Sequence, residues 1–255
     1  RVAVGRRAET RGAGYGTVKR GDVVKSTVGR PPSYSLARSA GLTLAVGLVG
    51  LGTHWAAKHL GWDFPSFGYA VGIVVWKLAT LGLLAHALWR YEGRALDARA
   101  LGLTRDVFSR ERRATARVAG LALLGTVALW FAVAQIPGLG TSLASAETYG
   151  QVRTVSAGVL LLQVLVAYPL TVLAEEAFFR GFLQPRLPWA PPVLSGVLWA
   201  VHHLQQASTI PSLVPLGVAL GIIRWWTGDV RVSGLVHYAG DVAFFLSSYT
   251  VAERL

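Results

Sequence analysis

Seven stretches of apolar residues follow one another along the chain, separated by polar or basic segments. Most of them approach the roughly 20 residues that a helix needs to cross a lipid bilayer. The fifth and sixth are shorter, so their presence is better defined than their ends. The stretches cover residues 36–57, 66–89, 118–136, 155–184, 191–204, 212–226 and 232–249. This pattern predicts an all-α, polytopic integral membrane protein, a helical bundle with about seven transmembrane helices.

The composition supports a single membrane domain. Hydrophobic residues make up 53% and charged residues 15% of the 255 residues, and the charged share is below the ~25% typical of soluble domains. The 29 glycines suit closely packed membrane helices. The chain has no cysteine, which excludes disulfides, thiolate zinc sites and a cysteine nucleophile.

The net charge of +12 arises mainly from two basic groups that flank apolar stretches. Nine Lys and Arg lie in residues 1–38 and eight Arg in residues 90–117. This placement is typical of membrane topology rather than of a nucleic-acid face, so the expected partner is the lipid bilayer. A cytoplasmic N-terminus puts 20 basic residues on the inner side and three on the outer side. We therefore expect that orientation, and the Arg-rich composition of a GC-rich coding sequence indicates a prokaryotic plasma membrane.

Ionisable residues inside the apolar stretches are the candidates for chemistry, because each costs about 2.5 to 3.5 kcal/mol on insertion scales. The fourth stretch contains Glu175 and Glu176, followed by Arg180. Glu176 and Arg180 are four residues apart and share a helix face, so we expect them to pair. Glu175 points about 100° away, toward a different environment.

Two further polar groups lie in the fifth and seventh stretches. His202 and His203 end the fifth, and His237 and Asp241 share one face of the seventh. Measured from the cytoplasmic helix ends, these groups and Glu175 lie about 8 to 18 Å deep. A single polar chamber, open toward the cytoplasm, would satisfy all of them.

Three ordered motifs resemble those of the type II CAAX prenyl endopeptidases, also called the CPBP or Abi family of intramembrane proteases. The sequence EEAFFR fits the family's EExxxR motif. WAVHH places Trp199 and His203 at the FxxxH spacing, with Trp in place of Phe. HYAGD places His237 and Asp241 in the HxxxN/D motif. The resemblance covers roughly residues 155–249.

The resemblance implies an intramembrane endopeptidase whose substrate is a membrane-embedded or lipid-linked peptide. Glu175 and His203 would activate a water molecule, and His237 and Asp241 would bind the oxyanion. Asp241 can donate a hydrogen bond only when protonated, and otherwise it would orient His237. The supporting residues would be Glu176, Arg180 and Trp199.

A metal-dependent mechanism with the same residues stays open. Glu175, His203 and His237 form a set of two histidines and one carboxylate, which can hold a catalytic zinc with an open position. No cofactor is certain from the sequence, and zinc is the candidate. The HExxH motif is absent from the sequence.

The chain divides by this interpretation into three regions. Residues 1–35 form a basic, disordered cytoplasmic tail. Residues 36–154 contain the N-terminal transmembrane helices and a basic cytoplasmic loop. Residues 155–250 form the CPBP-like catalytic membrane core of four helices.

Other interpretations of the same residues remain. Glu176 and Arg180 can serve as a purely structural ion pair, and His202 is expected to be a neighbour of the site because the motif spacing selects His203. Lys77, near mid-membrane, either pairs with a carboxylate of the site or snorkels along a cavity. Pro169 is expected to kink the fourth helix.

Two other functions fit the sequence less well. One is a non-proteolytic scaffold or bacteriocin-immunity protein that keeps the fold. The other is a proton-coupled transporter, since intramembrane acids and histidines also build proton relays. The absence of an inverted repeat argues against the transporter.

Overall fold

The computed structural model describes residues 33–62, 66–98 and 157–252, together with the single positions 103, 120, 125 and 128. Within these residues all regular structure is helical. Most of the predicted tail, most of the basic loop and most of the third apolar stretch at 118–136 lie outside the described residues. The helices are α1 (Leu36–His59), α2 (Phe67–Glu92), α6 (Ala157–Leu162), α7 (Tyr168–Glu175), α8 (Pro191–Val201), α9 (Ile210–Thr227) and α10 (Val230–Ala252).

Four helical stretches among the described residues are long and apolar enough to cross a membrane. They are Leu36–His59, Phe67–Glu92, Gly158–Arg186 and Ile210–Thr227. They correspond to the first, second, fourth and sixth predicted segments. The fifth is only the 11-residue helix α8, and the seventh is α10, of 23 residues. The integral membrane class is therefore supported, whereas the number seven is not confirmed.

The fourth segment is one continuous helix with two widened turns. A π turn at Gln163–Ala167 links α6 to α7, and the Tyr168 N–H donates to the Gln163 carbonyl five residues back. This turn stands directly before Pro169, where the sequence predicts a kink. Because proline has no N–H to donate, a locally irregular ladder is expected there. A second π segment, Glu176–Leu183, carries most of the EEAFFR motif and leads into the 3₁₀ turn Gln184–Arg186. Such π turns occur frequently at functional sites.

Glycines allow α8 and α9 to pack at unusually close range. A Cβ atom added at Gly196 would lie 2.4 Å from the Val218 nitrogen, and one at Gly217 would lie 2.5 Å from the Gly196 carbonyl oxygen. Gly221 makes the same kind of approach to Pro192. Small residues of this spacing are typical of contacts between membrane helices.

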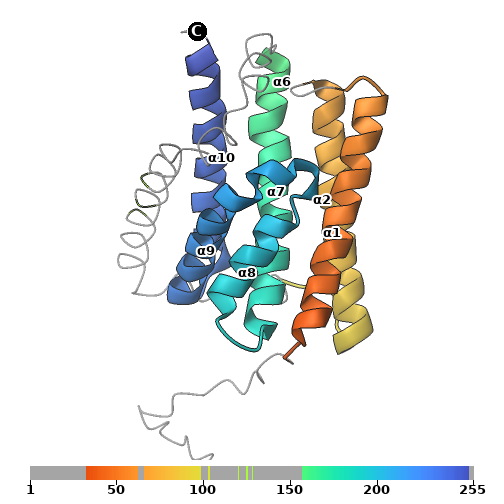
Figure 1. The fold of residues 1–255 in the computed structure, drawn as a ribbon, viewed down its shortest axis with the longest axis vertical. Helices are drawn as coiled ribbons and strands as arrows, with labels where there is room; N and C mark the ends of the chain where they lie inside the picture. Colours follow the sequence, from red (N-terminus) through yellow and green to blue (C-terminus); the bar gives the residue numbers. More distant parts are fainter. Residues whose placement is uncertain are drawn as a thin grey trace, which may run out of the picture. The chain divides into compact units, whose positions relative to one another are not determined.

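The turn between α8 and α9 lies beside the middle of α1. This turn contains the 3₁₀ segment Leu204–Thr209. A Cβ atom at Gly47, halfway along α1, would lie 3.0 Å from both the His202 carbonyl oxygen and the Leu204 side chain. Figure 1 shows this turn at mid-height beside α1. The α8–α9 hairpin therefore returns at the mid-depth of its neighbours and presents His202 there.

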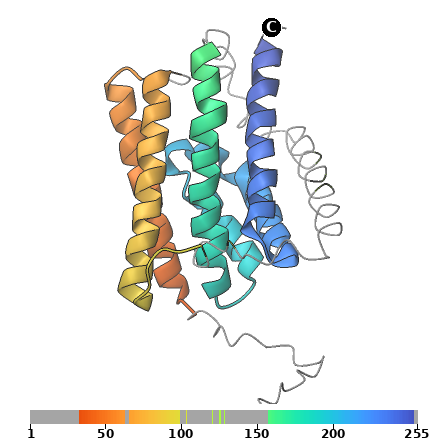
Figure 2. The ribbon, with the colours of Figure 1, turned by 180° about the vertical axis from the view of Figure 1, so that it is seen from behind.

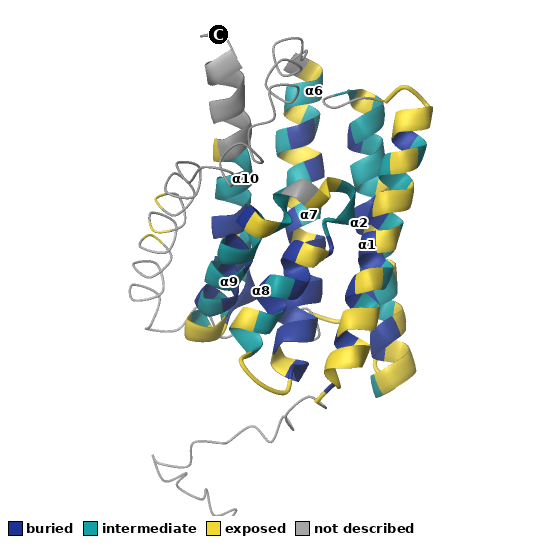
Figure 3. Ribbon diagram, in the orientation of Figure 1, coloured by how far each residue is buried: buried dark blue, intermediate teal, exposed yellow. Residues whose placement is uncertain are grey.

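The core lies below that turn, where the second π segment packs against α2 and α8. Figure 3 shows buried residues gathered around the lower part of the long helix and the adjoining α8 and α9. Figure 2 shows α10 running along the other side of the same long helix. The core includes Leu84, Leu88, Phe178, Phe179, Phe182, Leu183, Leu198, Trp199 and Leu216.

A buried polar cluster closes the lower end of the core. Arg186 forms two bonds to Glu92 at the end of α2, with Nε 2.5 Å from Oε1 and NH2 2.8 Å from Oε2. The Tyr34 hydroxyl donates to the same Glu92 Oε1 at 3.0 Å. The Tyr34 N–H donates to the Arg186 carbonyl at 2.7 Å. Burial and the neighbouring Glu92 carboxylate raise the pKa of Tyr34 to about 12.

Candidate active site

Glu175 stands at the last position of α7 and is 1% exposed. Its two carboxylate oxygens each receive a strong donor. Lys77 Nζ lies 2.5 Å from Oε1, and Trp199 Nε1 lies 2.5 Å from Oε2. His202 Nε2 also lies 3.3 Å from Oε1. Three helices therefore converge on this one carboxylate.

Lys77 reaches the site from α2, outside the three sequence motifs. It is 2% exposed, and its ammonium group lies 3.3 Å from the centroid of the Trp76 ring. The sequence left open whether Lys77 pairs with a carboxylate or snorkels. The structure shows the pairing, and the partner is Glu175.

Glu176 belongs to a separate network on the α9 and α10 side. Arg180 NH1 lies 3.2 Å from Glu176 Oε1, so the predicted ion pair is present. Arg180 NH2 donates to the Gly217 carbonyl at 3.1 Å, which ties this pair to α9. Ser233 Oγ donates to Glu176 Oε2 at 2.6 Å. The neighbouring carboxylates thus point into different surroundings, as the helical spacing predicts.

His237 of α10 bridges the two networks. Its Nδ1 lies 3.0 Å from Glu176 Oε1. Its Nε2 lies 3.8 Å from Glu175 Oε2 and 3.7 Å from Asp241 Oδ2. The structure therefore brings the residues of the first and third motifs into contact.

Both histidines of the second motif reach the site. The α8 helix ends at Val201, so His202 and His203 occupy the turn that follows, with ring centroids 4.0 Å apart. Both Nδ1 atoms contact the Trp199 carbonyl oxygen, that of His203 at 3.1 Å. His202 is fully buried, whereas His203 is half-buried. The direct contact with Glu175 is made by His202, which the motif spacing had placed beside the site.

Trp199 has an indole N–H that can donate a hydrogen bond, whereas the Phe of the usual motif has no such donor. Its indole N–H donates to Glu175, and its ring stands 5.0 Å from the His203 ring and 5.3 Å from the His237 ring. The Arg180 guanidinium lies 5.0 Å from the same indole. Trp199 is thus the packing centre of the site.

One group among the described residues has the composition of a metal site. Atoms of Glu175, His202 and His203 lie within 4.8 Å of one another. The sequence had grouped His237 with Glu175 and His203 instead. The fit to a divalent cation is poor, because the Lys77 ammonium lies 2.5 Å from Oε1 of Glu175 and the Trp199 N–H donates to Oε2, so a metal ion there would lie beside another positive charge.

The site is closed on the side of the second π segment and partly open at the level of the α8–α9 turn. Phe178, Phe179 and Phe182 are fully buried below it. In contrast, His203 is half-buried and the Asp241 side chain is 26% exposed. These two residues are therefore the more accessible part of the site.

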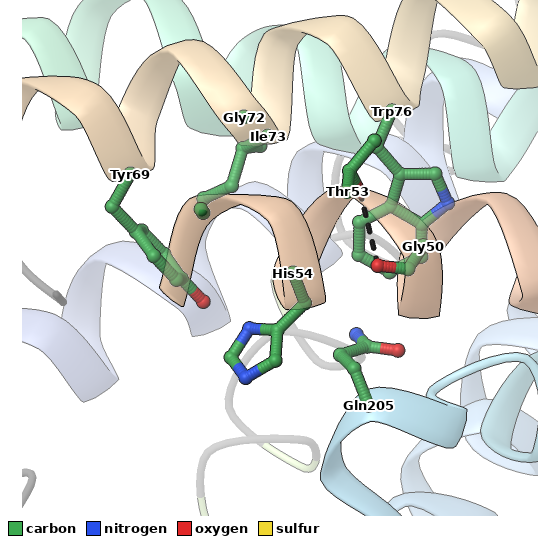
Figure 4. Close-up of a pocket in the computed structure, with 9 residues that line it drawn as sticks. Gly50, Thr53, His54, Tyr69, Gly72, Ile73, Trp76 and Gln205 are labelled. Atoms are coloured by element: carbon green, nitrogen blue, oxygen red, sulfur yellow. Dashed lines mark hydrogen bonds between the residues drawn. The ribbon is translucent and has the colours of Figure 1, made fainter. Parts of the chain in front are cut away.

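A small cavity adjoins the site behind Trp76. Figure 4 shows it between α1 and α2, with His54, Tyr69 and Gln205 among its lining residues. Its volume of about 20 Å³ is enough for about one water molecule. The Trp76 ring lines this cavity and lies 5.6 Å from the His202 ring, so one side chain contacts both the cavity and the site.

Two contacts of the site were not predicted. His202 contacts Glu175, and Ser233 contacts Glu176. Ser233 lies four residues before His237 and so on its helix face, a spacing that could have indicated it.

The comparisons with known proteins agree with the motifs. Residues 156–243 match the family described as type II CAAX prenyl endopeptidase Rce1-like. The match covers about a third of the chain and includes every motif residue, while Lys77 lies outside it. No curated protein and no solved structure matches the chain. The resemblance read from the three motifs is therefore confirmed over this segment.

Proposed function

We propose, from the membership of residues 156–243 in the type II CAAX prenyl endopeptidase family, that this chain is an intramembrane endopeptidase. It would hydrolyse a peptide bond in a membrane-embedded or lipid-linked peptide. The family match supports proteolysis in general, and the geometry of the site supports the roles of individual residues.

The observation that carries the proposal is the spacing of Glu175 and His203. A carboxylate oxygen of Glu175 and a ring nitrogen of His203 lie within 4.8 Å of each other. One water molecule, making hydrogen bonds of about 2.8 Å to each, spans such a gap. Because His203 is half-buried rather than enclosed, water can reach this position. Glu175 and His203 would then act together as the base that activates the water for attack.

His237 and Asp241 would stabilise the negative charge that develops on the carbonyl oxygen. In its protonated form His237 donates from both ring nitrogens, and its Nε2 points between Glu175 and Asp241. Glu176 accepts from the other nitrogen and holds the ring in place. Fixed donors in a secluded site stabilise an oxyanion more strongly than water does.

Glu176 and Arg180 would support the site without touching the substrate. Both are buried, and their contacts with His237 and with the Gly217 carbonyl connect α10 and α9 to the long helix. Their contribution is to fix the orientation of His237.

The proposal includes the orientation of the chain in the membrane and the type of membrane. The excess of basic residues at one set of helix ends supports a cytoplasmic N-terminus. With the Arg-rich composition, it supports a prokaryotic plasma membrane as the location. An accessibility assay on a tag at residue 1, in intact cells and after permeabilisation, tests the orientation. Labelling in intact cells contradicts it.

A cleavage assay tests the activity. Purified wild type, Glu175→Ala and His203→Ala are incubated in detergent or liposomes with libraries of membrane peptides, and products are identified by mass spectrometry. We expect cleavage by wild type and a loss of about 100-fold or more in either variant, as for removal of a general base.

Matched controls separate chemistry from folding. Asp97→Asn removes an exposed carboxylate and His86→Ala an exposed imidazole, both outside the site. Both controls should cleave like wild type. Cleavage that survives Glu175→Ala or His203→Ala overturns the mechanism, and no cleavage by wild type favours the scaffold alternative.

A further inference from the structure

The donors that hold Glu175 come from positions where the family motif provides none. Lys77 lies on α2, outside the matching segment 156–243, and Trp199 stands where the motif has Phe. Both oxygens of the carboxylate therefore have a strong donor that the three motifs do not supply. The feature that needs an explanation is a full positive charge buried at 2% exposure against the central carboxylate.

Stability alone does not explain this charge. The desolvation of a buried ion pair often cancels its Coulombic gain, and an apolar pair of similar volume is often as stable. The ammonium lies against the one residue of the site that would act on the water. Its position therefore points to a role in the chemistry of Glu175.

The position of Lys77 also conflicts with a metal ion. A zinc ion held by Glu175, His202 and His203 would sit about 2 Å from a carboxylate oxygen. Lys77 Nζ lies 2.5 Å from Oε1. An ion on that oxygen would be within a few ångström of the ammonium, where a double and a single positive charge repel each other strongly. The other oxygen is engaged by the Trp199 N–H.

We propose that Lys77 is the built-in cation of this site: it takes the place of a metal ion beside Glu175, positions that carboxylate and excludes zinc. This role of Lys77 rests on the proposed endopeptidase function, but zinc binding can be measured whether or not the protein cleaves peptides. Lys77 is a positioning residue, since it acts through Glu175 rather than on the substrate.

Zinc binding by the purified chain tests the proposal. Wild type, Lys77→Met, Lys77→Arg and the double variant Lys77→Met with His203→Ala are dialysed against zinc, and bound metal is measured by mass spectrometry. Lys77→Met removes the charge and keeps the length of the side chain. Lys77→Arg keeps the charge and serves as the matched control.

The expected pattern is specific. Wild type and Lys77→Arg bind no zinc at the site. Lys77→Met binds one equivalent, with affinity raised by roughly 100-fold or more because the repulsion is removed, and the double variant loses it. One equivalent bound by wild type and lost in His203→Ala overturns the proposal. So does a folded Lys77→Met that binds no zinc.

Two further measurements keep the result decisive. If Lys77→Met does not fold, wild type and His203→Ala are compared alone. Zinc that binds to wild type and is lost in His203→Ala contradicts the exclusion of zinc by Lys77. No bound zinc in wild type supports that exclusion. Where cleavage is observed, wild type should retain it in chelator. Failure of the proteolytic function appears as absent cleavage and leaves the zinc stoichiometry unchanged, so the two ideas fail separately.

Discussion

Replacing Glu92 by alanine should destabilise the protein by about 3 to 4 kcal/mol. The carboxylate is 3% exposed and forms a bidentate pair with Arg186, whose side chain is 4% exposed. Removal of one partner of a buried pair costs about 3 to 5 kcal/mol, because the other charge remains buried without compensation. Loss of the Tyr34 bond adds about 1 kcal/mol, and water that enters at this end of the core offsets part of the total.

The measurement is unfolding of the detergent-solubilised protein, followed by circular dichroism during titration with a denaturing detergent. Asp97→Asn is the matched control, because it removes a carboxylate from an exposed pair with Arg94 at 3.9 Å. Such a pair contributes at most about 1 kcal/mol. Arg186→Ala and the double variant with Glu92→Ala complete a cycle that isolates the coupling between the two residues.

Either of two results would contradict a strongly stabilising pair of Glu92 and Arg186. One is a free energy of unfolding of Glu92→Ala that lies within about 1 kcal/mol of that of Asp97→Asn, because about 1 kcal/mol is the upper limit for an exposed ion pair. The other is strict additivity in the cycle, which would show that Arg186 and Glu92 do not stabilise each other.

Three further predictions concern Tyr34, Trp199 and Gly217. Because the folded-state pKa of Tyr34 is raised from 10.0 to about 12, its contribution is fully present below pH 10 and is lost as the pH rises toward 12. The stability difference between wild type and Tyr34→Phe should therefore shrink over that window, and a constant difference contradicts the assignment. Trp199→Phe removes one hydrogen bond to a charged carboxylate, worth about 1.5 to 3 kcal/mol, so the melting temperature should fall by several degrees. The loss of this donor to Glu175 should also lower kcat/KM at least about tenfold, and unaltered kinetics would show that the indole N–H is dispensable. Gly217→Ala should lower the free energy of unfolding by about 1 to 3 kcal/mol, since its Cβ would lie 2.5 Å from the Gly196 carbonyl oxygen. Gly82→Ala is the control and should be neutral or stabilising, because there is open space around its Cβ. Equal effects of the two substitutions on unfolding would refute the close packing.

The sequence predicted the features that depend on local spacing. The apolar stretches at 36–57, 66–89 and 155–184 are helices, close to the predicted limits. The Glu176–Arg180 pair follows from the i, i+4 spacing on one helix. The motifs of the fourth and seventh segments meet, as the comparable depths of their polar residues required.

Features that depend on how helices pack could not be predicted. The partner of Lys77 is set by the position of α2 against α7, which no local spacing encodes. The role of His202 was missed because α8 ends at Val201, so helical periodicity does not separate His202 from His203. The close approach of α8 and α9 at Gly196 and Gly217 is likewise a feature of helix packing. The number of membrane crossings could not be predicted either. A short apolar stretch such as 191–204 can cross the membrane, or it can turn back inside the membrane where it is buried in protein.

The carbonyl group of Trp199 determines which ring nitrogen of His203 carries a proton. A carbonyl oxygen can only accept a hydrogen bond, and it lies 3.1 Å from Nδ1 of His203. The bond therefore requires the Nδ1–H tautomer, and in the neutral ring the lone pair is left on Nε2. A base that accepts a proton from water needs that lone pair. The Trp199 carbonyl at the end of α8 thus keeps His203 in the tautomer that can act as a base, a state that nitrogen NMR of the labelled imidazole can identify.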